Sequence, residues 1–211
     1  MRKAILVIAM CCGSGAVAEE VVIAALGDSL TQGYGLPQEQ GFVQQMQAWL
    51  DGQGADVRLI NAGVSGDTTA GGLARVDWTL TPEVDAMIVA LGGNDLLRGI
   101  DPDVSRASLE GIMQAAETRE VDVLLVGMQA PGNYGPAYKE RFDAIYPDLA
   151  AEFGADLVPG FFDGLAAEGN DLSSVSDLMQ PDGIHPNAAG VARIVAAMGP
   201  AVLALVGESA E

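Results

Sequence analysis

The sequence lacks the residues on which several classes of protein depend. Its 211 residues include two cysteines, Cys11 and Cys12, and one histidine, His185. Both lie within the first 18 residues, which we expect to be removed, so the remaining chain has neither a disulfide framework nor a cysteine-ligated zinc site. One histidine excludes a histidine-based metal cluster. No glycine-rich nucleotide fingerprint follows the apolar run at 21–26, which argues against nucleotide binding. We therefore expect neither a metal nor a cofactor.

Basic side chains are scarce as well. Lys and Arg number 10 against 29 Asp and Glu, a formal net charge of −19. Nucleic acid and anionic membranes repel such a chain, so we expect no nucleic-acid partner. Apolar residues make up 49% and charged residues 18%. A chain of this length and composition predicts one ordinary domain with its own core, and no hydrophobic segment demands a partner, so we expect a monomer.

The first 18 residues have the pattern of a secretory signal peptide. Arg2 and Lys3 form a basic start, residues 4–12 are apolar, and residues 16–18 are a small-x-small cleavage site. Nine apolar residues are too few to span a bilayer, which needs about 20, so we expect no stable membrane insertion. Cleavage near Ala18 predicts a periplasmic or secreted protein whose single domain is 19–211.

Two other interpretations of this leader stay open. It could be an uncleaved anchor or a buried N-terminal helix. It could also be a lipoprotein signal ending at Cys11 or Cys12, although Met10 is larger than the residue such signals favour. Cleavage after Ala18 removes both cysteines and two positive charges, leaving a chain without a catalytic thiol and with a net charge of −21.

Beyond the leader, apolar runs alternate with helical periodicity. Continuous apolar runs suit parallel strands that are buried on both faces. Strands are predicted at 21–26, 57–60, 86–91, 123–126 and 157–158, with helices around 42–50, 109–116, 138–153 and 191–198. Ser105 and Asn187 are predicted helix N-caps, Pro147 is expected to kink or break its helix, and Gly199-Pro200 to interrupt the last one. The fold class is α/β, a parallel sheet with helices on both faces.

Polar residues gather where the strands end. The segments are 27–30, 61–68 and 92–95, each directly after a strand, and 182–186, just before the last helix. Ligands in parallel α/β sheets bind at the carboxyl ends of the strands, so these segments should meet. Together they supply a nucleophile, a base, an orienting carboxylate and oxyanion donors, as acyl transfer requires.

His185 is the only residue available as a histidine base. Asp182 precedes it by three residues, with Gly183 between them and Pro186 after it. This spacing lets the carboxylate reach Nδ1 across one turn and fix the tautomer.

These motifs resemble the GDSL, or SGNH, hydrolase superfamily, and within it the small secreted arylesterase, thioesterase I and lysophospholipase L1 group. The resemblance covers essentially the whole chain after the leader. It is carried by ALGDSLTQGYGL (25–36), NAGVSGDTTAGG (61–72), ALGGNDLLRG (90–99), GMQAPGNYGPAY (127–138) and MQPDGIHPN (179–187). It implies a flavodoxin-like three-layer α/β/α fold with a mostly five-stranded parallel sheet, and metal-free hydrolysis of esters or thioesters.

The superfamily's named residues map onto Ser29, Gly63, Asn94 and His185, with Asp182 completing the triad. Ser29 would be the nucleophile, His185 the base and Asp182 its orienting carboxylate. The oxyanion hole would comprise the backbone N–H groups of Ser29 and Gly63 and the side-chain amide of Asn94. Glycine at 63 would let the backbone approach the substrate or adopt a positive φ.

Other residues near the site have less specific roles. Asp28 and Asp95 are expected to hold loops by accepting backbone hydrogen bonds. The segment 129–138 has a loop composition with aromatic faces. It is expected to form the substrate-binding wall, and its candidate residues are Gln129, Pro131, Asn133 and Tyr134. Phe161 and Phe162 are expected in the core, with lining of an acyl channel as the alternative.

The expected substrates are aryl esters and short-to-medium acyl esters. Acyl thioesters and lysophospholipids are further candidates, with neutral esters ahead of acyl-CoA because the chain is so acidic. A carbohydrate O-acetyl esterase on the same fold is an alternative, although aromatic residues are only 5% of the chain. A non-catalytic periplasmic binding protein is another, but the triad is complete.

Overall fold

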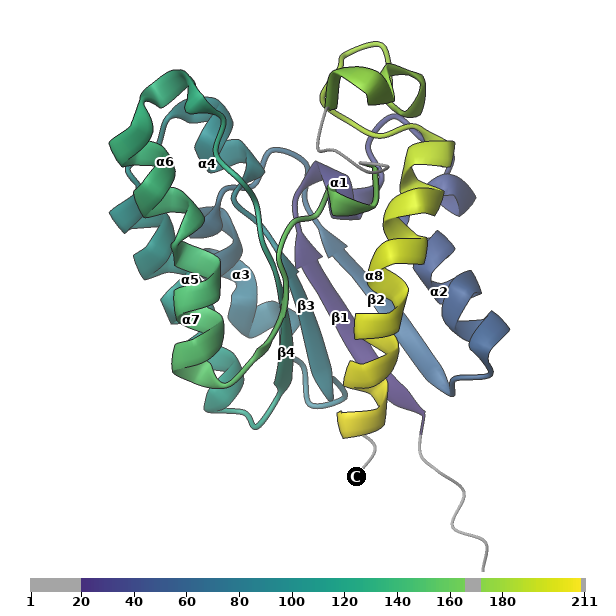
Figure 1. The fold of residues 1–211 in the computed structure, drawn as a ribbon. Coiled ribbons are helices and arrows are strands. Elements are labelled where there is room, and N and C mark those ends of the chain that lie inside the picture. Colours follow the sequence, from purple (N-terminus) through teal and green to yellow (C-terminus); the bar gives the residue numbers. More distant parts are fainter. Residues whose placement is uncertain (1–19, 166–171, 210–211) are drawn as a thin grey trace, which may run out of the picture.

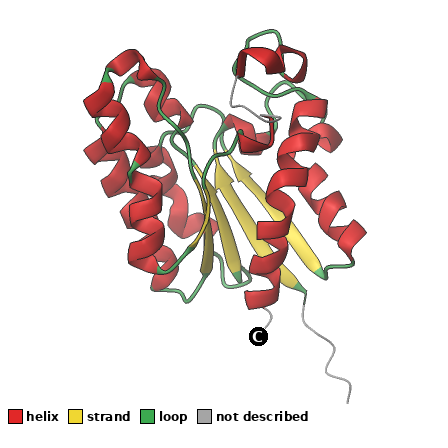
Figure 2. Ribbon diagram, viewed as in Figure 1, coloured by secondary structure: helices red, strands yellow, loops and turns green. Residues whose placement is uncertain are grey.

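The computed structural model describes residues 20–165 and 172–209, without the side chains of 172–174. The predicted signal peptide, its cleavage site and Cys11 and Cys12 lie outside the described residues. The described chain forms three layers, with a parallel sheet between two layers of helices (Figures 1 and 2). This confirms the predicted fold class.

Five strands make the sheet, in the order β2-β1-β3-β4-β5, and all pairs are parallel. The strands are β1 (Val21–Gly27), β2 (Val57–Gly63), β3 (Ala86–Ala90), β4 (Asp122–Val126) and β5 (Asp156–Val158). Every residue of the central β1 and β3 is buried, as their unbroken apolar runs predict. The order reverses direction at β1, with β2 on one side and β3 on the other. Crevices form at such a switch point.

Helices cover both faces of the sheet (Figure 1). On one face lie α2 (Phe42–Gln53) and α8 (Ala188–Ser209); on the other lie α3 (Thr69–Thr79), α5 (Pro102–Glu117), α6 (Pro136–Asp143) and α7 (Ile145–Phe153). Two short helices, α1 (Ser29–Gln32) and α4 (Gly93–Arg98), follow β1 and β3 directly. They lie above the carboxyl ends of the strands in Figure 1 and carry two of the predicted site residues.

The predicted break at Pro147 is confirmed. Helix α6 ends at Asp143 and α7 begins at Ile145, which places Pro147 in the first turn of α7. A proline is tolerated there, since the first N–H groups of a helix have no partner within it. The predicted cap of α8 is confirmed too, because Asn187 Oδ1 accepts from the N–H groups of Ala189 and Gly190.

Two predictions about helix ends are wrong. Ser105 does not cap α5. The cap is Asp101, one turn before Ser105, and its side chain accepts from the N–H of Asp103. Ser105 is buried inside the helix. Gly199-Pro200 does not interrupt α8, which continues to Ser209. Apolar residues after the proline, Val202 and Leu205, are buried, and that packing carries the helix past the missing hydrogen bond.

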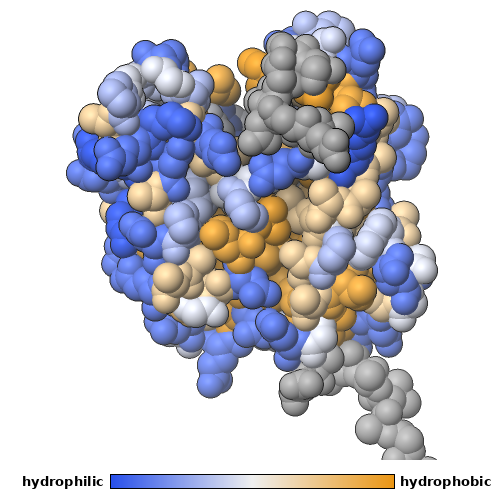
Figure 3. Space-filling model, viewed as in Figure 1, coloured by the Kyte–Doolittle hydropathy of each residue, from blue (hydrophilic) through white to orange (hydrophobic). Residues whose placement is uncertain are grey.

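Helix α8 is long and apolar enough to cross a membrane by length and composition. Half of its most apolar window is buried inside the fold, where it packs against α2 and the sheet. The face shown in Figure 3 is largely hydrophilic, with apolar residues gathered between α7 and α8. The apolar composition of α8 is therefore accounted for by its packing in the core of the fold.

Candidate active site

A cavity of about 640 Å³ opens at the carboxyl ends of the strands. The polar segments predicted to meet do meet around it. Ser29 comes from α1, Ser65 and Gly66 from the loop after β2, and Asn94 from α4; Asp182 and His185 come from the loop before α8. In Figure 3 the surface is hollowed at the top of the view, on the side toward which the strands point.

Ser29, His185 and Asp182 form a continuous chain of hydrogen bonds. His185 Nε2 lies 2.8 Å from Ser29 Oγ, and His185 Nδ1 lies 2.7 Å from Asp182 Oδ2. A carboxylate opposite Nδ1 requires a proton on that nitrogen, which leaves Nε2 free to accept from the Ser29 hydroxyl. This is the geometry of a nucleophile, its base and an orienting acid.

Asp182 is held in its charged form by its own loop. Its Oδ1 accepts from the backbone N–H groups of Ile184 and His185, at 2.9 and 3.0 Å. The backbone bond from His185, followed by the imidazole and Ile184, lowers the pKa of Asp182 to about 2. The carboxylate therefore stays ionised at neutral pH and fixes the imidazole.

Asp28 holds the turn that presents Ser29, as expected. Its Oδ1 accepts from the Leu30 N–H at 2.9 Å, and its Oδ2 accepts from Asn94 Nδ2 at 3.2 Å. Burial raises the pKa of Asp28 to about 6, against the lowering effect of these two hydrogen bonds. Asp28 thus ties the nucleophile turn on α1 to the Asn94 side chain on α4.

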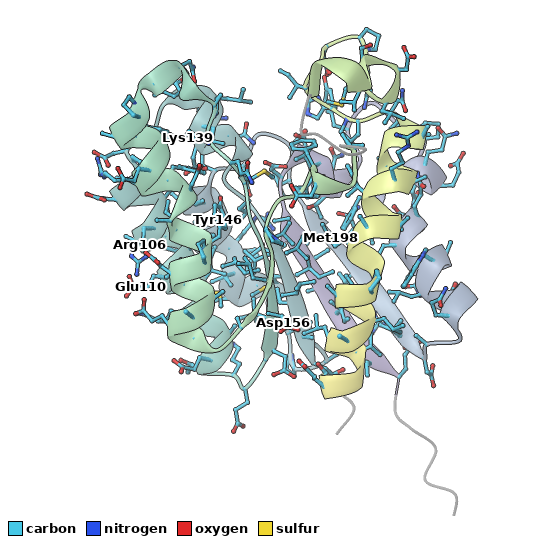
Figure 4. The ribbon with its side chains drawn as sticks, in the orientation of Figure 1. Arg106, Glu110, Lys139, Tyr146, Asp156 and Met198 are labelled. Carbon is cyan, nitrogen blue, oxygen red and sulfur yellow. The ribbon has the colours of Figure 1, made fainter. Side chains whose placement is uncertain are left out.

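Asp95 fastens the loop after β2, which confirms its expected role. It is fully buried and accepts from Thr69 N at 2.9 Å, Thr69 Oγ1 at 2.6 Å and Ser105 Oγ at 2.9 Å. Tyr146, which points from α7 toward the sheet in Figure 4, donates to the Leu91 carbonyl at 2.8 Å just before α4. Both contacts fix the backbone around Asn94.

The assignment of Gly63 to the oxyanion hole is wrong. Gly63 ends β2, does not line the cavity, and its N–H donates to Asn61 Oδ1 at 3.0 Å. Glycine is required there for another reason. A Cβ would clash with the backbone N of Gln32 and lie 2.9 Å from the carbonyl oxygen of Asp28. Gly63 lets β2 pack closely against α1, with no positive φ.

Gly66 lies at the cavity instead. It has a φ of +85°, and the N–H of Asp67 donates to the Val64 carbonyl at 3.1 Å, the features of a type II turn. Within residues 20–165 and 172–209, no acceptor pairs with the backbone N–H of Gly66. Arg98 Nη2 donates to the Gly66 carbonyl at 2.8 Å. Gly66 was not predicted, although the sequence Ser-Gly-Asp within the predicted polar segment 61–68 is typical of a turn.

The predicted wall residues all line the cavity: Gln129, Pro131, Asn133 and Tyr134. Phe161 is buried in the core, as expected, against Phe42 with ring centroids 5.5 Å apart. It also lines the cavity, as does Phe162.

Several apolar lining residues were not predicted. Tyr34 lies against the His185 imidazole, with ring centroids 4.8 Å apart, and Leu97 and Ile184 are exposed at the cavity. The charged residues among the described lining are the carboxylic acids Asp28, Asp163 and Asp182. Burial raises the pKa of Asp163. The lining is thus apolar with acidic groups, which suits an uncharged ligand.

Comparisons with known proteins identify relatives of this chain. The model of the GDSL-like Lipase/Acylhydrolase family matches residues 25–193. Esterase TesA of Pseudomonas aeruginosa is 41% identical over 182 residues, covering 86% of this chain and 87% of the relative. Thioesterase 1/protease 1/lysophospholipase L1 of Escherichia coli K12 is 37% identical, covering 77% and 74%.

Solved structures share the fold. The crystal structure of AlinE4, an SGNH-hydrolase family esterase, has a TM-score of 0.72 and 44% identity, covering 87% of this chain and 95% of that one. The family match spans most of the chain, and these relatives cover 77% to 87% of it. The chain therefore belongs to the GDSL-like lipase/acylhydrolase family.

Proposed function

We propose that this protein is a serine esterase that hydrolyses carboxylic esters through an acyl-enzyme. The observation that supports this most is the hydrogen-bonded chain from Ser29 through His185 to Asp182, open to the cavity. It supplies a nucleophile, a base and the base's orienting acid in one geometry.

Acylation begins when His185 Nε2 removes the proton from Ser29 Oγ. The oxygen attacks the ester carbonyl, and the carbonyl electron pair moves onto its oxygen to give a tetrahedral oxyanion. The carbon–oxygen bond to the leaving group then breaks, and His185 returns its proton to the departing alcohol. Asp182 stays ionised and stabilises the imidazolium, consistent with its lowered pKa.

Deacylation repeats these steps with water. His185 takes a proton from water, the oxygen attacks the acyl carbon, and Ser29 leaves with the proton from His185. The products are the free acid and the original enzyme. No metal takes part in either half-reaction.

The proposed oxyanion donors are the N–H of Ser29, the N–H of Gly66 and Asn94 Nδ2. Neither backbone N–H has a partner among the described residues, so both are free to donate. Asn94 uses one amide hydrogen on Asp28 at 3.2 Å, which leaves the second hydrogen available. Such fixed donors favour the tetrahedral state over the ground state.

The proposed substrates are neutral aryl esters and short-to-medium acyl esters. A cavity of about 640 Å³ is within the range of small-molecule sites. Gln129, Pro131, Asn133 and Tyr134 would form the wall that contacts the acyl or leaving group. Acyl thioesters and lysophospholipids are candidates of the same chemistry, and the E. coli relative carries both in its name.

We further propose that residues 1–18 are removed and that the mature enzyme is a periplasmic or secreted monomer. The basic start, the apolar run and the small-x-small site support cleavage and export. The intact mass of the protein recovered from outside the cytoplasm tests it. We expect the mass of a chain that begins at Glu19. The mass of a chain that still begins at Met1 would contradict cleavage.

Replacing the nucleophile tests the proposed function. Ser29→Ala should lower kcat on p-nitrophenyl acetate by about 10³-fold or more, because loss of a triad member typically costs that much. Ser209→Ala is the matched control, since that hydroxyl bonds Asp122 at the start of β4, away from the cavity. If purified Ser29→Ala keeps activity within tenfold of wild type, the proposed function is wrong.

A further inference from the structure

The loop that carries Asp182 and His185 is closed at its base. Met179 and Pro186 form an antiparallel bridge, and the backbone N–H of Gln180 donates to the His185 carbonyl at 2.7 Å. The Gln180 carbonyl in turn accepts from the Gly183 N–H at 2.9 Å. Asp182 and His185 are therefore held together within one closed loop, and their distance from Ser29 depends on what fastens that loop to the nucleophile segment.

The side chain of Gln180 joins this loop to the nucleophile segment. Its Nε2 donates to the Tyr34 carbonyl at 2.8 Å and to the Pro186 carbonyl at 3.0 Å. Both partners can only accept, so the amide must present its NH₂ to them and its oxygen to Gly35. A side chain at Gly35 would meet that oxygen and lie 3.1 Å from Gln180 Cδ. Both amide hydrogens are thus used, one on each segment.

These contacts complete a ring that contains the reacting atoms. The Tyr34 N–H donates to the Ser29 carbonyl at 3.0 Å, which links Gln180 back to the nucleophile. The ring runs from Ser29 to Tyr34, to Gln180 and to His185, and the 2.8 Å contact between His185 Nε2 and Ser29 Oγ closes it. Gln180 does not line the cavity, so it has no contact with a bound ester.

Other hydrogen bonds of the loop that carries Asp182 and His185 do not reach the nucleophile segment. Asn187 Nδ2 donates to the carbonyls of Asp177 and Met179, which fastens the loop to the segment before it. In the part of the chain that the structure describes, Gln180 makes the one hydrogen bond between this loop and residues 29–36 apart from the triad contact itself. The Tyr34 ring, which rests against the imidazole, adds only a packing contact.

We propose that Gln180 is a positioning residue that sets the approach of His185 to Ser29. This inference rests on the proposed function and deepens it. The Gln180 amide holds the acid–base loop against the nucleophile segment, so that proton transfer from Ser29 begins at hydrogen-bond distance. Removing the amide donor leaves Asp182 and His185 paired within their loop but frees that loop to shift away from Ser29.

Two substitutions remove the donor while keeping the size of the side chain. Gln180→Met has no donor, and Gln180→Glu places a carboxylate against two carbonyl oxygens. Each should lower kcat on a p-nitrophenyl ester by about 10²-fold, the typical cost of a misplacement of about 1 Å. KM should stay within about twofold, because Gln180 does not touch the cavity.

A second observable separates positioning from general loosening. His185 is the only histidine, so its Nδ1 proton, shared with Asp182, gives a single assignable imidazole resonance in a proton NMR spectrum. This resonance should persist in both variants. A variant whose loop has simply unfolded would lose it, because Asp182 and His185 would no longer be paired.

Gln47→Met is the matched control. The Gln47 amide also bonds two backbone groups, the Val57 carbonyl and the Leu59 N–H, both at 2.8 Å, but on β2 away from the cavity. It should lower the thermal midpoint and leave kcat unchanged. Gly35→Ala is a further test that keeps Gln180 in the chain. Its Cβ would displace the amide, and the φ of +75° at this position adds backbone strain, so the same fall in kcat is expected together with a lower thermal midpoint.

The outcomes separate the two proposals. A fall in kcat with the imidazole resonance retained supports the positioning role. Wild-type kcat in the Gln180 variants, or in Gly35→Ala if those variants do not fold, overturns it. So does loss of the resonance together with activity. If Ser29→Ala is inactive while the Gln180 variants are fully active, this inference fails and the proposed function stands.

Discussion

Gly66→Ala tests the oxyanion turn most informatively, because the structure gives the cost of the change. Gly66 has a φ of +85°, a region that costs an alanine about 1–2 kcal/mol. There is room for the methyl group, whose nearest neighbour is Arg98 Nη2 at 3.7 Å. The substitution therefore acts on backbone conformation and not on packing.

The backbone can relieve this strain by a local change of turn type. A type I turn keeps the hydrogen bond from Asp67 to Val64 and suits alanine, but it differs from type II by a flip of the peptide between Ser65 and residue 66. That flip turns the N–H of residue 66 away from the oxyanion. In the transition state the donor is worth about 2.7–4 kcal/mol, more than the strain of about 1–2 kcal/mol, so the turn flips back.

The expected loss is therefore the strain and not the whole donor. It amounts to about 5- to 30-fold in kcat, since about 1.4 kcal/mol is tenfold in rate. The assay is kcat and KM for p-nitrophenyl acetate together with the thermal midpoint, with Gly63→Ala as the contrast. Gly63→Ala clashes with the Gln32 backbone and should cost about 1–3 kcal/mol of stability. Wild-type kcat in Gly66→Ala would refute the assignment of its N–H to the oxyanion hole.

Three further predictions concern charge and donors. Asn94→Ala should lower kcat about 10²- to 10³-fold with little change in KM, measured with the same ester, because an oxyanion donor acts in the transition state. The pKa of Asp28 is raised to about 6, so its ionisation in the folded protein costs stability as pH rises from about 4 to 6. Asp28→Asn should therefore gain stability over wild type across that window, by denaturant titration at both ends, and an equal difference at pH 4 and 7 would contradict this. Finally, kcat/KM for an acyl-CoA should rise with salt from 0.01 to 0.1 M, while that for a neutral ester stays flat. The chain without its first 18 residues has a net charge of −21, and this salt range shortens the Debye length from about 30 to about 10 Å. Acyl-CoA turnover independent of salt would show that net charge does not control access.

The sheet was predictable because burial leaves a direct mark on sequence. Strands β1 and β3 are covered on both faces, so every position is apolar or small. Helix α3 was not predicted. Its first turns contain Gly71 and Gly72, which weaken any helical pattern, and it forms because Thr68 caps it and α5 packs against it.

The sequence predicted the start of α8 correctly and the start of α5 incorrectly. Asn187 is predictable as a cap from its place directly before an apolar periodic run, and it does cap α8. The predicted cap, Ser105, lies one turn too late, because Asp101 followed by Pro102 starts the helix and proline favours the first helical position. Ser105 was needed inside the helix as a donor to buried Asp95, a contact that periodicity does not reveal.

The triad was predictable because its members differ in chemistry from their surroundings. One histidine, with a carboxylate three residues before it, admits few arrangements. Gly63 and Gly66 are equally plausible oxyanion donors from the sequence, because each has a backbone N–H and no side chain. Only the path of the backbone shows that Gly63 ends a strand and that Gly66 lies in an open turn. Tyr34 and Gln180 were missed because their partners lie about 150 residues away in sequence.

The most direct measurement of the central claim is the site at which an aryl phosphonate modifies the enzyme. Ser29 is the hydroxyl that His185 contacts at 2.8 Å. Mass spectrometry of the inactivated protein should therefore show one phosphonyl group per chain, located on Ser29, with residual activity falling in proportion to its occupancy. Ser29→Ala should take up none. Full occupancy of Ser29 with activity retained, or inactivation with the group on another residue, would contradict catalysis by this serine.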